Sequence, residues 1–306
     1  MSSLFTLSKL LLKASRPKHW TKNLLVFAAP LFSFQPELLI WLKSLQALIS
    51  FCLLSSAVYI FNDVIDAKSD RLHPIKKYRP IASKSLNVKI ACIFSIILIL
   101  TSFYIGFIVE NSLLLILSLY LFIQIIYCIK LKEEPIFDLM CISSGFLLRA
   151  ISGGISSDLI ISPWFLLSIG FLALFLALEK RKAEIRSMQS NHIITRKVLN
   201  RYSLPLLLRL ESLVASSSFV TYSLWAAGPA LKGAKTSWML LTVPFVLIGI
   251  FQYQLLSDPD EASRRKDYNS TRTPENPEEI LLQDKGIRIT VISWLLTTIF
   301  IGITTS

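Results

Sequence analysis

Residues 43–62 read KSLQALISFCLLSSAVYIFN, and this stretch decides the fold class of the chain. Its one charge is Lys43 at the start, and about 20 residues are enough for an α-helix to cross the hydrocarbon core of a bilayer. Similar apolar stretches recur along the chain. We expect spans near residues 22–36, 43–62, 87–109, 112–129, 136–156, 161–178, 205–227, 236–256 and 289–305. The sequence thus predicts an all-α polytopic membrane protein, with about nine transmembrane helices in one bundle around a central cavity open to the cytoplasmic face.

The overall composition supports this class and excludes most soluble ones. Hydrophobic residues make up 53% of the 306 positions and charged residues only 17%, whereas a soluble domain carries roughly 25% charged residues. The four cysteines stand singly in apolar stretches, so neither a disulfide framework nor a zinc site is expected. We expect a single domain over residues 1–306 without a removable signal peptide, and no nucleic-acid partner. The oligomeric state is not readable from the sequence.

The distribution of Lys and Arg predicts the orientation of the chain. Connections on one side of the predicted spans carry 27 of these residues, and those on the other side carry only Lys43, Lys232 and Lys235. Basic residues concentrate on the cytoplasmic side of membrane proteins, so we expect a cytoplasmic N-terminus in the inner (plasma) membrane and an external C-terminus. Attraction to anionic lipid explains the net charge of +12 without any active site.

An ordered acidic cluster begins where the second span ends. If the helix continues, Asn62, Asp66 and Asp70 follow at intervals of four residues, with Asp63 three residues before Asp66, and all four point to one broad face. Carboxylates this close repel one another unless a cation neutralises them, and Mg²⁺ takes oxygen ligands and shares its shell with substrate phosphates. We predict that Asp63, Asp66 and Asp70 bind Mg²⁺ and that Asn62 orients this catalytic set. A solvated polar loop is the alternative.

A second constellation spans residues 127–154. Asp138 and Arg149 are eleven residues apart, close to three helical turns, so they share a helix face, on which Gly145 would leave room for a ligand. Arg149 lies well inside an apolar span, where a charged Arg costs at least about 2.5–3.5 kcal/mol and needs an anionic partner. That partner is either Asp138, in a structural ion pair, or a substrate phosphate. Both interpretations remain open.

Basic residues around these two clusters are candidate phosphate ligands. One run follows the acids directly, and another follows the sixth span, where Lys180 and Glu184 also fit an ordinary salt-bridged helix end. The predicted substrate-binding residues are Lys22, Lys76, Lys77, Arg79, Tyr127, Lys130, Lys132, Asp138, Arg149, Lys180 and Arg181. In the last cytoplasmic loop, 257–288, the Asn276-Pro277-Glu278-Glu279 sequence is typical of a helix start and predicts a short cap helix.

Together these motifs resemble the UbiA superfamily of intramembrane prenyltransferases. The resemblance covers nearly the whole chain and lies in NDVID at 62–66 with Asp70, RPKHWTKN at 16–23, HPIKKYRPIA at 73–82, Tyr127 with LK at 131–132 and Asp138, GFLLR at 145–149 and KRKAE at 180–184. Its finer features are similar to the branch that uses phosphoribosyl pyrophosphate. Aromatic-substrate members carry a second Asp-x-x-x-Asp set, whereas here Ile142 stands four residues after Asp138 and cationic residues flank it.

The resemblance implies a magnesium-dependent transfer of the 5-phosphoribosyl group from phosphoribosyl pyrophosphate to a polyprenyl (decaprenyl-type) phosphate, with release of pyrophosphate. The acceptor phosphate is already anionic at neutral pH, so no strong general base is required. In the family, the product leads toward cell-wall polymers. The chain length and saturation of the lipid are not readable from the sequence.

Two alternatives remain. A prenyltransferase acting on an aromatic or tetrapyrrole acceptor would keep the fold and the metal, but the missing second acidic set argues against it. A non-enzymatic carrier of anionic lipid would need charges along a path through the bundle, whereas nearly all charges here lie on one predicted face.

Overall fold

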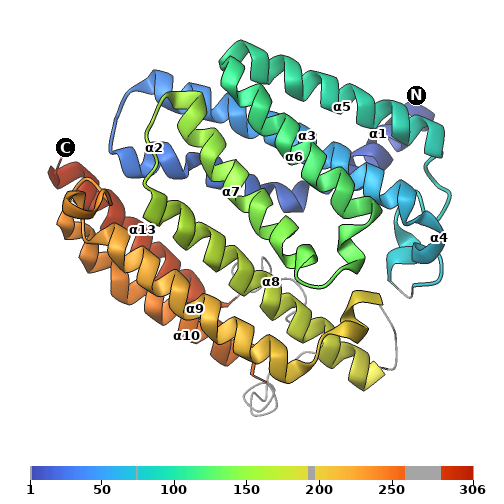
Figure 1. Cartoon of the computed structure of the whole chain (residues 1–306). Helices are drawn as coiled ribbons and strands as arrows, with labels where there is room; N and C mark the ends of the chain where they lie inside the picture. The colour runs from blue at the N-terminus through green and yellow to red at the C-terminus, as the bar shows by residue number, and fades with distance from the viewer. Residues whose placement is uncertain (1, 74, 192–196, 259–283, 306) are drawn as a thin grey trace. The chain divides into compact units, whose positions relative to one another are not determined.

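The computed structural model describes residues 2–73, 75–191, 197–258 and 284–305, and within these ranges the chain is almost entirely helical and has no strand (Figure 1). Eight of the described helices are long and apolar enough to cross a membrane, which confirms the all-α membrane architecture. They are α3 (Leu38–Ile65), α5 (Val88–Val109), α6 (Asn111–Ile129), α7 (Phe137–Ser157), α8 (Pro163–Asn191), α9 (Leu204–Ala226), the pair η6 (Ser237–Thr242) and α10 (Val243–Leu256), and α13 (Lys285–Thr305).

Shorter elements connect these helices. They are α1 (Ser2–Ser15), η1 (Pro17–Phe27), α2 (Ala28–Ser33), α4 (Ala67–Asp70), η2 (Lys76–Tyr78), η3 (Leu131–Glu133), η4 (Lys197–Arg201) and η5 (Pro229–Leu231). The predicted cap helix at 276–279 lies outside the described residues.

The first expected span, 22–36, differs from the prediction. In its place the chain forms the 3₁₀ helix η1 and then α2, which has only six residues. Six residues of α-helix extend about 9 Å, far less than the thickness of a bilayer. Pro30 within α2 lacks a backbone N–H, so it cannot extend the hydrogen-bond ladder back toward η1. The hydrophobic stretch is real, but it is not one regular helix.

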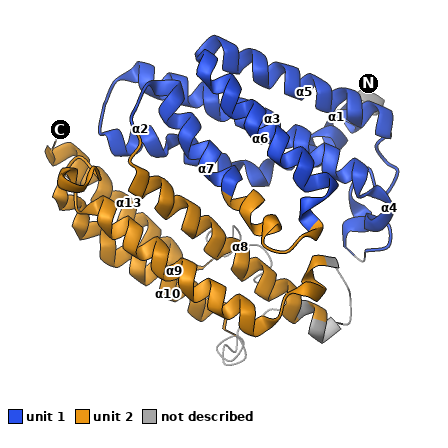
Figure 2. Ribbon diagram, viewed as in Figure 1, with its two compact units in different colours: residues 1–132, 144–160 blue, residues 133–143, 161–306 orange. Residues whose placement is uncertain are grey.

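The chain divides into two compact units (Figure 2). Unit 1 comprises residues 1–132 and 144–160, and unit 2 comprises residues 133–143 and 161–306. The boundary passes through α7, whose first turns belong to unit 2. The predictions of a single domain and of a central cavity stay predictions.

Unit 1 is built around α3, which packs most extensively on α5. Small side chains such as Ala47, Ser50 and Ala57 are fully buried on α3 and allow the neighbouring backbones to approach closely. Two serine hydroxyls of α5 then donate to α3 carbonyls, Ser102 to Ser50 at 2.8 Å and Ser95 to Ala57 at 3.1 Å. These contacts satisfy polar groups that lipid cannot, and they fix the helix that carries the acidic motif.

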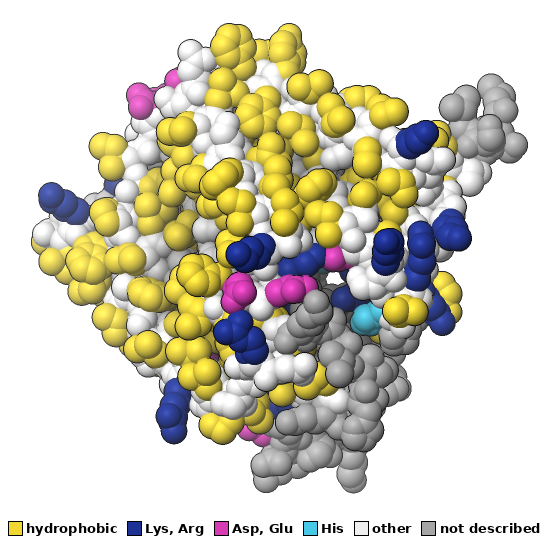
Figure 3. All heavy atoms as spheres, turned by 45° about the vertical axis from the view of Figure 1, so that its right-hand side comes forward, with side chains coloured by type: hydrophobic (Ala, Val, Ile, Leu, Met, Phe, Trp, Pro, Cys, Tyr) yellow, Lys and Arg dark blue, Asp and Glu magenta, His cyan; other side chains and the backbone are white. Residues whose placement is uncertain are grey.

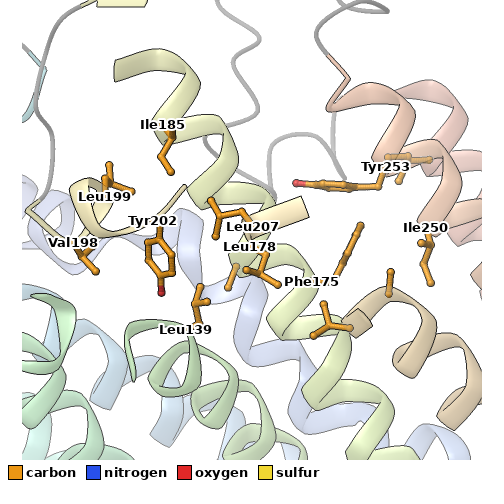
Figure 4. Packing of buried hydrophobic residues seen from close by; sticks show 14 residues of the cluster. Leu139, Phe175, Leu178, Ile185, Val198, Leu199, Tyr202, Leu207, Ile250 and Tyr253 are labelled. Carbon is orange, nitrogen blue, oxygen red and sulfur yellow. The ribbon is translucent and has the colours of Figure 1, made fainter. Parts of the chain in front are cut away.

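Unit 2 has its own apolar core, to which α8, α9, α10 and α13 contribute (Figure 4). The rings of Phe175 and Tyr253 meet edge-on, with centroids 5.5 Å apart, and Tyr202 lies beside Leu139 and Val198. This core holds the end of α8 that carries the predicted basic run.

Candidate functional site

The acidic cluster lies where α3 continues into α4 with an interruption of one residue, Asp66. The Asp66 N–H donates to the Asn62 carbonyl at 2.9 Å, and the Asp70 N–H donates to the Asp66 carbonyl at 2.8 Å. These i to i+4 bonds carry the helical repeat through residue 70, as the spacing predicted. Asp63, Asp66 and Asp70 therefore lie on successive turns, and the Asn62 side chain beside them is partly exposed.

Each of the three carboxylates contacts a basic side chain of unit 1. Asp63, which is 2% exposed, accepts hydrogen bonds from Arg16 and from Arg79 Nη1, the latter at 3.2 Å. The same Arg79 Nη1 contacts Asp70 at 2.7 Å, so one guanidinium nitrogen joins two of the acids. Lys132 Nζ contacts Asp66 at 2.5 Å. Three cations therefore balance three anions within the cluster, which we call the acid cluster.

The acid cluster offers the ligand chemistry that Mg²⁺ requires. Among the described residues, no three His, Cys, Asp or Glu side chains are gathered as a metal site, and cationic groups contact the carboxylate oxygens of the acid cluster. Those oxygens are nevertheless the ligands that Mg²⁺ prefers. If the ion pairs of Arg79 and Lys132 with the acids were broken, the carboxylates could bind a metal and the two cations could bind phosphate. The donor set fits Mg²⁺, and the metal assignment stays a prediction.

Arg16 is a site residue that the sequence reasoning did not single out. It contacts Asp63, and its guanidinium lies 5.1 Å from the centre of the Tyr59 ring. Its backbone is left-handed, with φ of 52°, which costs a non-glycine residue roughly 1–2 kcal/mol. Arg16 opens the RPKHWTKN segment, so the segment itself was the available sequence signal.

Arg149 lies within unit 1 among neutral groups. It donates from Nε to Asn23 Oδ1 at 2.6 Å, from Nη1 to its own helix at Gly145 O at 2.6 Å, and from Nη2 to the Tyr120 hydroxyl at 3.0 Å. The expected alternative of an Asp138–Arg149 ion pair is wrong, because Asp138 pairs with a different arginine, Arg181. The side chain is 5% exposed, so it is packed as part of the interior.

Gly145 makes room for that guanidinium. A Cβ atom at residue 145 would lie 3.1 Å from Arg149 Nη1 and 3.4 Å from Gln124 Nε2. The space that the sequence assigned to a ligand is therefore occupied by the arginine itself. Its partner Asn23 also donates to Cys52 Sγ and Ser55 Oγ, both at 3.3 Å, which ties η1 to α3.

Asp138 is the centre of a second polar cluster, in unit 2. It is fully buried and accepts from Arg181 Nε at 2.8 Å and from the Tyr202 hydroxyl at 2.7 Å. Burial raises the pKa of Tyr202 and the adjacent carboxylate adds to this, so the phenol stays protonated and donates at neutral pH. The same hydroxyl accepts the N–H of Ile136, whose φ is 69°. The sequence predicted Asp138 and Arg181 but gave no sign of Tyr202.

The end of α8 carries more buried charge than an ordinary helix end. Arg181 contacts Glu184 at 2.5 Å, and Lys182 contacts both Glu179, at 2.8 Å, and Glu211 of α9. Gln254 of α10 completes this network by donating to Glu211 at 2.9 Å. The end of α8 is therefore salt-bridged, with Glu184 paired to Arg181 and with Lys182 paired to Glu179 and Glu211.

The other predicted substrate-binding residues lie nearer the surface. Lys77 and Lys130 are exposed, and the Lys77 ammonium lies 5.2 Å from the centre of the Tyr78 ring. The partly exposed residues are Lys22, Lys76, Tyr127 and Lys180. Two of the predicted phosphate ligands, Arg79 and Lys132, contact the acid cluster.

Comparisons with known proteins agree with these motifs. The profile of the UbiA prenyltransferase family matches residues 24–271. The chain is 34% identical over 300 residues to a decaprenyl-phosphate phosphoribosyltransferase of Mycolicibacterium smegmatis, covering 94% of this chain and 90% of that one. It is 32% identical to the protein of the same name from Corynebacterium glutamicum, covering 93% and 84%.

Solved structures extend the similarity to the fold. A UbiA homolog from Archaeoglobus fulgidus, bound to GPP and Mg²⁺, superimposes with a TM-score of 0.69 over 96% of this chain and 99% of that one. The same homolog bound to DMAPP and Mg²⁺ gives a TM-score of 0.67. At 16% identity these likenesses establish the fold alone. With the family profile and the near full-length relatives, they show that the chain is a multi-pass membrane transferase belonging to the UbiA prenyltransferase family.

Proposed function

We propose that the protein transfers the 5-phosphoribosyl group of phosphoribosyl pyrophosphate to a polyprenyl phosphate and releases pyrophosphate. The observation that carries this proposal is the similarity, over more than nine-tenths of the chain, to proteins named decaprenyl-phosphate phosphoribosyltransferase. In the proposed reaction a phosphate oxygen of the lipid forms a bond to C1 of the ribose, while the bond from C1 to the pyrophosphate oxygen breaks and its electron pair leaves with the pyrophosphate.

The acid cluster gives the residues their proposed roles. Asp63, Asp66 and Asp70 would hold Mg²⁺, which when bound offsets the charge that develops on the departing pyrophosphate. Arg79 and Lys132 contact these acids in the structure. When the carboxylates bind the metal, the N–H groups of both side chains would donate to phosphate oxygens instead. Asn62 and Arg16 would orient the set. The work of the protein here is positioning and charge compensation.

The arrangement around Asp138 favours this donor over a prenyl diphosphate. A second metal set would need a further carboxylate beside Asp138, but among the described residues Asp138 is bonded by Arg181 and Tyr202. We therefore infer one metal-binding motif rather than two. We also place the proposed site at the cytoplasmic face of the inner membrane, on the basis of the Lys and Arg distribution.

The proposal is tested with ribose-labelled phosphoribosyl pyrophosphate, Mg²⁺ and polyprenyl phosphates of several lengths, added to membranes that contain the protein. We expect the label to enter the lipid fraction. A parallel incubation with labelled prenyl diphosphate and an aromatic acceptor should give no labelled product. Transfer from prenyl diphosphate alone would establish the alternative prenyltransferase, and no transfer from either donor would overturn the proposed function.

A single substitution tests the metal role. Asp66→Ala should lower magnesium-dependent release of pyrophosphate by about 100-fold or more, the range for losing a preorganised electrostatic contact at a reacting centre. The matched control is Glu37→Gln, because this exposed carboxylate lies just before the other end of α3 and has no part in the site. Release at the wild-type rate by the purified Asp66→Ala protein would show that the metal assignment is wrong.

A further inference from the structure

Helix α1 has two apolar faces, and the rest of the described chain covers only one of them. Leu7, Leu10 and Leu11 pack against the core that α3 and α5 share. On the outer face, Phe5 is 73% exposed and Leu12 is 56% exposed. These outer residues share one face because they are seven positions apart in a helix. At 14 residues, α1 is too short to span a membrane.

A second exposed apolar strip lies in the connection after α4. Leu72, Ile75 and Tyr78 are 89%, 73% and 67% exposed. The strip and α1 both adjoin the acid cluster, since Arg16 directly follows α1, Arg79 directly follows Tyr78, and both arginines contact Asp63. Exposed apolar side chains of this size, next to a charged site, mark a surface that contacts something other than water.

Unbalanced positive charge accompanies both strips. Lys9 and Lys13 are exposed on α1, and Lys68 and Lys77 are exposed beside the second strip. The nearby acids Asp63, Asp66 and Asp70 are already paired with Arg16, Arg79 and Lys132. None of the four lysines forms an ion pair with another described residue. Figure 3, which turns the side with the N-terminus and α4 forward, shows Lys and Arg side chains gathered there beside hydrophobic ones.

We propose that the outer face of α1 and the residues 68–73 and 75–78 bind the anionic phospholipid headgroups of the bilayer leaflet around unit 1. Phe5, Leu12 and Leu72 would enter the boundary between headgroups and acyl chains, while the lysines hold the phosphates. A second copy of the chain fits poorly, because a symmetric contact through this face would oppose lysine to lysine. The proposal concerns the bilayer rather than the substrate lipid, and it does not depend on the proposed reaction.

The test is hydrogen–deuterium exchange of the α1 amides in the full-length protein, held in nanodiscs of phosphatidylcholine alone or mixed with phosphatidylglycerol. We expect exchange of α1 to be slower by about 30-fold in the anionic discs, as expected for two lysines at such a surface. High salt should remove the difference. The variant K9Q/K13Q should lose it, whereas K232Q/K235Q, with the same change of charge on the other predicted side of the membrane, should keep it.

Three outcomes would overturn the proposal. Equal exchange in both kinds of disc would show that α1 does not bind anionic headgroups. Equal behaviour of the two double variants would show that Lys9 and Lys13 are not the contacts. Protection that appears in neutral discs only when polyprenyl phosphate is added would assign the surface to the substrate lipid instead. None of these results depends on catalytic turnover, so failure here and failure of the proposed reaction are distinguishable.

Discussion

Arg149 shows how a charged side chain is accommodated within a span by neutral partners. Its guanidinium has three neutral hydrogen-bond acceptors and lies near the rings of Phe51, Tyr120 and Phe146, with centroid distances from 4.9 to 5.8 Å. Aromatic faces attract a cation most strongly where water is excluded. Because its bond to Asn23 reaches η1, Arg149 links α7 to the segment that begins beside Arg16.

This contact predicts energetic coupling between two positions 126 residues apart. Arg149→Met and Asn23→Ala should each lower the free energy of unfolding by about 1–3 kcal/mol, since each leaves a buried partner unsatisfied. The double variant should lose about 1 kcal/mol less unfolding free energy than the sum of the two single variants, because the same hydrogen bond is lost in each. Denaturant unfolding in detergent of the wild type, the two single variants and the double variant measures this double-mutant cycle. Arg209→Met, at an exposed arginine, should be additive with Asn23→Ala, and additivity of Arg149 with Asn23 would contradict the coupling.

Single residues of the site were predictable where the chain's local geometry decides their position. The repeat from Asn62 to Asp70 is a property of one helix, so spacing placed these acids correctly. The identity of their partners was not predictable in the same way. That Arg16 contacts Asp63, and that Asp138 pairs with Arg181, follows from how distant segments pack.

At the scale of elements, η1 passes very close to α7. A Cβ atom at Gly153 would lie 1.9 Å from the Val26 carbonyl oxygen, so only glycine permits this approach. Hydropathy predicted eight of the spans because the length of an apolar run is read locally. It could not predict the 3₁₀ helix η1 that overlaps the first expected span, 22–36, nor its close packing against α7, because that contact joins segments far apart in the sequence.

The close approach predicts a strong effect from one methyl group. Gly153→Ala should lower the free energy of unfolding by about 1–3 kcal/mol, the usual penalty for overpacking, because η1 or α7 must shift. Gly249→Ala is the matched control: its Cβ would meet only Thr290 Cγ2, at 3.8 Å, and alanine favours the helix by up to about 1 kcal/mol. Thermal unfolding in the same detergent compares the two. A Gly153→Ala protein as stable as the control would refute the tight contact.

At the scale of the whole molecule, the separation of charge predicts which loops face which compartment. Ser83 lies in a connection with six basic residues, and Lys235 lies on the side with three, and both are exposed. In intact cells, a membrane-impermeant maleimide should label Lys235→Cys, and it should label Ser83→Cys only after the membrane is opened. The unsubstituted chain, with its four cysteines, provides the background. Labelling in the reverse order would invert the orientation proposed for the site.

The shared arginine of the acid cluster also bears on how the protein is made. Arg16, Asp63, Asp70 and Arg79 all lie in the first 79 residues, so these two acids and their counterions are synthesised before α5. The partner of Asp66, Lys132, is synthesised later, after α5 and α6. Asp63 and Asp70 thus have counterions from the same early part of the chain, so neutralising these two acids requires neither metal nor substrate.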